Sequence, residues 1–134
     1  MNWTLRHAAL VALVVTARAA PAAMPAVPVH VGGDAQLDAC GTLGAVTGLD
    51  PRGDNFLSVR SGPGGKPFGE VDRLHTGRQV TVCEQRGAWL GIVYAPGGRT
   101  IDCGTATPRP RATPYAGACR SGWVHRRYVR VIAG

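Results

Sequence analysis

The chain has 134 residues, of which 45% are hydrophobic and 17% are charged, and its formal net charge at pH 7 is +7. A chain of this length builds one domain of ordinary small size, whose modest core would gain from covalent links. The positive charge is moderate and no nucleic-acid-binding motif accompanies it, so nucleic acid is not an expected partner.

The N-terminal residues have the pattern of an export signal. A basic pair precedes the apolar run 8–15, and residues 17–19 place small side chains at the two positions that a signal peptidase reads. The apolar run is shorter than the roughly 20 residues that span a bilayer. We therefore expect a signal peptide over residues 1–19, with cleavage after Ala22 or Ala23 as the alternative. The mature protein is then periplasmic or secreted, with no membrane span.

All four cysteines lie beyond this signal, where they predict two disulfide bonds in an oxidising compartment. Zinc is the alternative, but the spacings of 43, 20 and 16 residues include no close pair of ligands. Of the three possible pairings we favour Cys40 with Cys83, which ties the N-terminal segment to a predicted strand. Cys103 would then pair with Cys119 and close a loop rich in proline and glycine.

In chain order, the mature sequence predicts a leader followed by short strands. Residues 20–36 are mostly Ala, Pro, Val and Gly, and we expect a flexible or partly extended leader before a single domain over residues 37–134. Alternating apolar residues between turn signals predict strands, and no helix of ten residues is expected. The predicted strands are residues 44–49, 57–60, 69–74, 79–84, 89–94, 122–125 and 128–132.

Two loops stand out between these strands. Residues 50–55 have the composition of a tight turn, because Pro fixes φ and Gly or Asn tolerates a left-handed backbone. The turn includes Arg52-Gly53-Asp54, an integrin-binding tripeptide that we interpret as part of the turn. Residues 96–121 form a long loop with several prolines and two cysteines, which we expect to be extended and pinned by a disulfide.

Short strands at close spacing predict an all-β fold, and an ordered set of motifs narrows it. Leu57-Ser58-Val59-Arg60 runs into the turn Ser61-Gly62-Pro63-Gly64, with Leu57 and Val59 facing the core. The motifs that follow in order are Leu74-His75-Thr76-Gly77, Val80-Thr81-Val82, Trp89, Gly122-Trp123-Val124 and Tyr128-Val129. The set resembles the bacterial SH3-like domain over residues 45–132.

The resemblance implies a small SH3-like β-barrel of five to six short strands with a long disulfide-pinned loop. It also implies binding of cell-wall glycopeptide or of proline-containing and extended peptides. Two insertions, residues 50–55 and 96–121, depart from the family's pattern and lie where such barrels choose their partners.

The sequence contains no recognisable catalytic set. Once the signal is removed, none of the histidines His30, His75 and His125 has a partner at the spacing of a metal pair. Disulfide-bonded cysteines cannot act as nucleophiles. We therefore expect no enzymatic activity, no cofactor and no metal, with a small cell-wall hydrolase as a remote alternative. Its candidate residues would be the loop carboxylates Asp50, Asp54 and Asp102.

Positive charge is concentrated after Asp102, where arginines alternate with aromatic residues. Arginine beside aromatic rings suits an anionic or carbohydrate-containing polymer, through bidentate contacts and stacking. The alternative is a solubilising basic surface around core aromatics, and roughly half of the candidates are expected to pack in the core. The candidate binding residues are Arg60, Trp89, Tyr94, Tyr115, Trp123, Arg126, Arg127 and Tyr128.

These observations predict an exported, non-catalytic binding module. Its expected partner is cell-wall glycopeptide, an anionic envelope polymer or an envelope protein. The alternative is a protein-interaction adaptor or inhibitor that acts through the loop 96–121.

Overall fold

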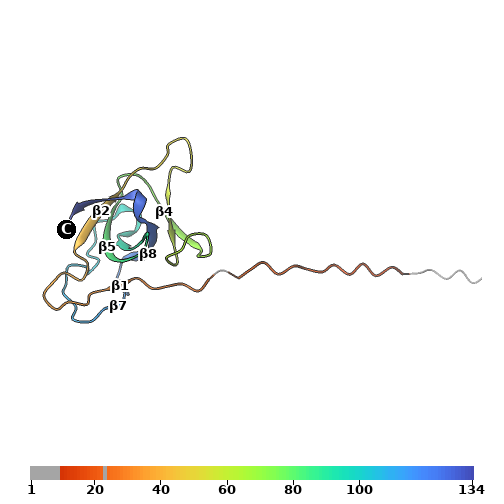
Figure 1. The fold of residues 1–134 in the computed structure, drawn as a ribbon, viewed down its shortest axis with the longest axis horizontal. Helices are drawn as coiled ribbons and strands as arrows, with labels where there is room; N and C mark the ends of the chain where they lie inside the picture. The colour runs from red at the N-terminus through yellow and green to blue at the C-terminus, as the bar shows by residue number, and fades with distance from the viewer. Residues whose placement is uncertain (1–9, 23) are drawn as a thin grey trace, which may run out of the picture.

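The computed structural model describes residues 10–22 and 24–134 and has an all-β fold, as predicted (Figure 1). Residues 10–22 run away from the domain as an exposed extended segment. The first nine residues of the predicted signal, and the alternative cleavage residue Ala23, lie outside the described residues. Within the described ranges, no helix is long and apolar enough to cross a membrane.

Seven antiparallel strands form the main sheet, in the order β4-β3-β8-β6-β5-β2-β9. Their bounds are β2 (Thr42–Val46), β3 (Leu57–Arg60), β4 (Glu70–Leu74), β5 (Gln79–Arg86), β6 (Trp89–Tyr94), β8 (Arg120–His125) and β9 (Val129–Ala133). Each of the seven predicted strands is confirmed, with some ends moved, so the sheet has more strands than the five to six that the resemblance implies. Two short 3-10 turns interrupt the chain, η1 (Pro96–Gly98) and η2 (Arg126–Tyr128).

The sheet wraps around one apolar core. Leu57 and Val59 of β3 are buried in it, as the alternation predicts, and β2, β4, β5, β6 and β8 also contribute buried side chains. Gly122 of β8 lies directly against Val59 of the neighbouring strand β3, and a Cβ added at Gly122 would overlap Val59 Cγ1. A residue with a side chain would force the two strands apart.

A second, smaller cluster covers the outer face of β5 and β6, and both disulfides belong to it. The pairings Cys40–Cys83 and Cys103–Cys119 are the ones that the sequence favoured. Val93 joins this cluster while Ile92 beside it joins the core, because successive side chains of a strand point to opposite faces. The long loop is therefore pinned against the sheet.

The N-terminal segment that was expected to be flexible or partly extended is hydrogen-bonded to the domain from Met24 onward. β1 (His30–Val31) pairs with β7 (Thr113–Pro114) of the long loop, and the two lie side by side in Figure 1. Val29 and Val31 are only 1% and 2% exposed. Val27, Val29 and Val31 occupy every second position, and this alternation turns their side chains toward the domain. We call residues 24–31 the strap.

Asp72 ties the edge strand β4 to the strands β6 and β8. Its Oδ2 accepts a hydrogen bond from the Tyr94 hydroxyl at 2.9 Å and from Arg120 Nη1 at 3.0 Å. Burial alone would raise the pKa of the Asp72 carboxyl, but hydrogen bonds from the Arg73 amide, Tyr94 and Arg120 hold that pKa below its usual 3.8. Burial and the Asp72 carboxylate raise the pKa of Tyr94.

Shortening Val29 to alanine should lower the free energy of unfolding by about 2 kcal/mol, because it removes buried methyl groups and leaves a cavity under the strap. Urea denaturation of the oxidised protein measures this loss. Val131→Ala is the matched control, since Val131 is 60% exposed, and it should change stability little. Equal stability of the two variants would mean that the strap is not packed in solution.

Asp72→Asn should lower stability by about 1 kcal/mol at neutral pH, since two bonds to a charged acceptor in a partly exposed setting are weakened. Because the folded-state pKa of Asp72 is depressed, its contribution is full above the unfolded pKa and disappears as pH falls through the folded value. The stability difference between the two proteins should therefore shrink below about pH 4. A difference that stays constant down to about pH 2 would contradict this role.

Candidate functional site

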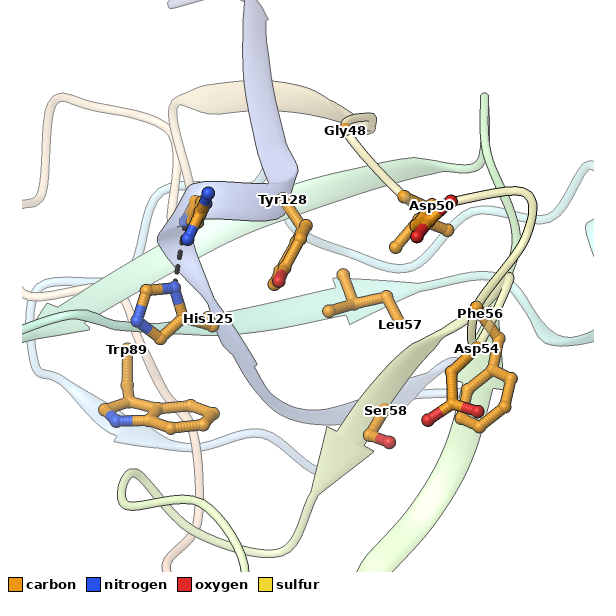
Figure 2. A pocket seen from close by; sticks show the side chains of 12 residues that line it. Gly48, Asp50, Asp54, Phe56, Leu57, Ser58, Trp89, His125 and Tyr128 are labelled. Atoms are coloured by element: carbon orange, nitrogen blue, oxygen red, sulfur yellow. Dashed lines mark hydrogen bonds between the residues drawn. The ribbon is translucent and has the colours of Figure 1, made fainter.

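A groove of about 530 Å³ lies between the loop that precedes β3 and the segment that follows β8. Figure 2 shows Trp89 and His125 on one side, Tyr128 near the middle, and Asp50 and Asp54 on the other side. The groove is therefore bounded by aromatic rings on one wall and by carboxylates on the other.

Strand pairing builds the aromatic wall. Trp89, the first residue of β6, lies opposite His125, the last residue of β8, in the register of the two strands. Their ring centroids are 5.4 Å apart with an interplanar angle of 81°, and the rings of His125 and Tyr128 are 6.2 Å apart. Edge-to-face contacts of this kind hold the rings in fixed orientations.

His125 also caps the turn η2. Its Nδ1 accepts a hydrogen bond from the backbone N–H of Arg127 at 3.1 Å. In the neutral ring the proton is then on Nε2, which stays available as a donor. His125 thus caps the turn η2, and this turn positions Tyr128, its last residue.

The acidic wall comes from the predicted turn over residues 50–55, which the structure confirms. Asp50 Oδ1 accepts a bond from the Arg52 amide at 2.9 Å, and the Gly53 amide donates to the Asp50 carbonyl at 3.1 Å. Neither Asp50 nor Asp54 forms an ion pair with another residue of the described ranges. Both carboxylates are exposed and face solvent at the groove.

Ser58 lines the groove beside the acidic wall and fixes a third carboxylate behind it. Its hydroxyl donates to Glu70, which also accepts from Arg73. These hydrogen bonds, the one from Ser58 first, lower the pKa of Glu70. The Ser58 hydroxyl hydrogen is therefore engaged by Glu70.

The groove brings together three of the eight predicted binding residues, namely Trp89, Arg127 and Tyr128. Arg126 is exposed on the same turn but does not line the groove. Arg60 instead donates from Nη1 to the Phe68 carbonyl at 3.1 Å and so braces the loop 61–68.

The other three predicted residues are packing residues. Trp123 is 0% exposed and Tyr94 is 3% exposed, so neither side chain forms part of the surface. The Tyr115 hydroxyl donates to the Cys103 carbonyl at 2.8 Å and accepts from the Cys119 amide at 3.1 Å, so it holds the disulfide loop. Aromatic residues beside arginines cannot be separated into core and surface from composition alone.

Sequence reasoning missed His125 as a groove residue and noted only that it has no partner at the spacing of a metal pair. The signal that could have found it is the strand register, which pairs His125 with Trp89. The remaining loop carboxylate, Asp102, accepts a bond from the Gly104 amide in the long loop and does not line the groove. No group of three potential metal ligands is present in residues 10–22 and 24–134.

The chain was compared with protein-family models, with curated proteins and with solved structures, and nothing matched it in any of the three. The kind of ligand that the groove can bind is therefore inferred from its own side chains. Ring faces suit sugars and peptide planes, while carboxylates and the His125 N–H offer directed polar contacts.

Replacing His125 by alanine should lower the free energy of unfolding by about 1 kcal/mol, because the Arg127 amide loses its cap acceptor. His125→Asn is the matched variant, since an asparagine side chain can accept the same hydrogen bond, and it should recover most of the loss. Chemical denaturation measures both. Equal losses in the two variants would show that ring packing, and not the cap, is the contribution of His125.

Proposed function

We propose that the protein is a non-catalytic exported binding module that takes an extended peptide or glycopeptide of the cell envelope in this groove. The observation that supports the proposal most is the aromatic wall, where Trp89, His125 and Tyr128 present ring surfaces to an open groove. All three side chains are half-buried, and Tyr128 also packs against the main core, so each ring is held in place while part of it faces the groove. Aromatic rings held in this way can stack on sugars and extended peptides.

We also infer that the seven-stranded sheet is an SH3-like barrel. Three features support this inference. The sheet wraps around one core, and β5, β6 and β8, which follow one another along the chain within this sheet, are hydrogen-bonded neighbours. The turn η2 precedes the last strand. The motif order in the sequence points the same way.

An envelope location fits the chemistry of the chain. Two disulfides are stable in an oxidising compartment, which agrees with the pattern of an export signal at the N-terminus. Loss of residues 1–19 would leave 13 basic and 8 acidic side chains, a net charge of +5. A positive protein is attracted to anionic envelope polymers, and this attraction weakens with salt.

A partner protein is the second candidate, and the tip of the long loop favours it. Pro108, Pro110 and Arg111 are exposed there. The Gly33 amide donates to the Arg109 carbonyl at 2.9 Å, and the Cys103–Cys119 disulfide closes the loop. A tip that is held in place loses less entropy on binding.

The direct test is retention of the mature protein on isolated peptidoglycan at low salt. Trp89→Ala should weaken retention by about tenfold, because it removes the largest ring of the aromatic wall. Arg126→Ala is the matched control, since Arg126 is exposed next to the groove but does not line it. Its loss should reduce retention only slightly and mainly at low salt.

Retention that Trp89→Ala leaves unchanged would reject the groove as the site. If Arg109→Ala with Arg111→Ala abolishes retention instead, the long loop is the binding element. No retention of the unmodified protein at any salt concentration would reject the envelope-binding proposal.

A further inference from the structure

The strap is held to the domain through amides that recur every three residues. The Met24 amide donates to the Pro67 carbonyl at 3.0 Å, the Val27 amide to the Ser61 carbonyl at 2.7 Å, and the His30 amide to Glu84 Oε1 at 2.7 Å. A spacing of three residues is also the period of a polyproline II helix, and the strap continues as strand β1 from His30. Pro25 and Pro28 each follow one of these donors, so the missing N–H groups of the prolines fall between the bonded positions.

The surface on which this segment lies is formed by Trp123, Arg86 and Gly91, and we call it the channel. The indole Nε1–H of the buried Trp123 donates to the Val27 carbonyl at 2.7 Å, and the guanidinium of Arg86 lies 5.1 Å from the centre of a Trp123 ring. Val29 is seated over Gly91, where an added Cβ would lie only 3.0 Å from Val29 Cγ1. The channel therefore recognises one carbonyl by a side-chain donor and one aliphatic side chain by shape.

These contacts match the way in which protein domains hold a separate extended peptide. Such domains bind polyproline II segments on aromatic side chains and read the peptide backbone by hydrogen bonds. None of the buried residues of the main core comes from the strap, whereas Val31, its last residue, is buried in the second cluster. The main core is therefore packed without the strap.

The strap can dissociate from the domain surface without the breaking of a covalent bond. Its contacts are all non-covalent, and the first covalent link downstream is the Cys40–Cys83 disulfide. Gly32 and Gly33, directly after the strap, have φ values of 87° and 111°, a backbone conformation that glycine adopts easily. Release of the strap would break neither disulfide.

We propose that the channel over Trp123 is a second peptide-binding site, separate from the groove, and that the strap is its exchangeable resident ligand. The partner that it fits is an exported chain with an uncharged, extended segment in which proline recurs every third residue and a branched aliphatic residue follows it. The strap sequence Val27-Pro28-Val29 is the example that the structure itself provides. The proposal does not depend on what the groove binds.

Because the strap belongs to the same chain, it competes with any partner for the channel at an effective concentration on the order of millimolar. The test therefore uses a chain in which the strap has been cut from the domain. A protease recognition sequence is placed in the mature chain between Gln36 and Leu37, in an exposed turn, and cut after folding. The probe is a fluorescent synthetic peptide of residues 24–31. We expect its anisotropy to rise on the nicked chain, with binding to the uncut chain weaker by about tenfold or more.

Variants identify where the peptide binds. Trp123→Phe keeps an aromatic ring but removes the indole N–H, and should weaken the peptide by about fivefold. Tyr128→Phe changes the groove and should leave peptide binding unchanged. A peptide with alanine at positions 25 and 28 should bind more weakly, because it is less preorganised as a polyproline II helix.

Three outcomes would overturn the proposal. One is a nicked chain that keeps a native near-ultraviolet circular dichroism spectrum but takes up no peptide. Another is a nicked chain that unfolds when its strap is diluted away, which would make the strap part of the fold. The third is peptide binding that Tyr128→Phe abolishes and Trp123→Phe does not, which would place the peptide in the groove.

Discussion

The arrangement of the whole domain depends on β6 being covered on both faces. Ile92 and Tyr94 point into the core, while Val93 points into the outer cluster that contains both disulfides. Gly91, on the same outer face as Val93, leaves room for the strap. The rest of the sheet covers one face of β6, and the long loop together with the strap covers the other.

Local patterns were enough to predict the inner layer. The alternation of Leu57 and Val59 and the apolar stretch from Trp89 to Tyr94 gave strands whose bounds the structure reproduces. Both favoured disulfide pairings are confirmed, one joining the N-terminal segment to β5 and one closing the long loop. The strand signals lie within a few residues of one another, so no long-range information was needed for them.

The outer layer and the groove could not be predicted in this way. The prolines of the strap hide its alternation, and its hydrogen bonds go to Ser61, Pro67 and Trp123, which are distant in the sequence. The groove requires the register that sets Trp89 opposite His125. Composition could show that arginines and aromatic residues gather in the C-terminal third, but not that Trp123 faces inward.

The loop 61–68 contacts both places where the domain could hold a ligand. Ser61 and Pro67 accept hydrogen bonds from the strap, while an added Cβ at Gly65 would lie 3.6 Å from Trp89 Cζ2 in the groove wall. Where two binding equilibria that share such a loop are coupled, the coupling is reciprocal. Any change in groove affinity caused by strap release would be matched by an equal change in the strap equilibrium when the groove is filled.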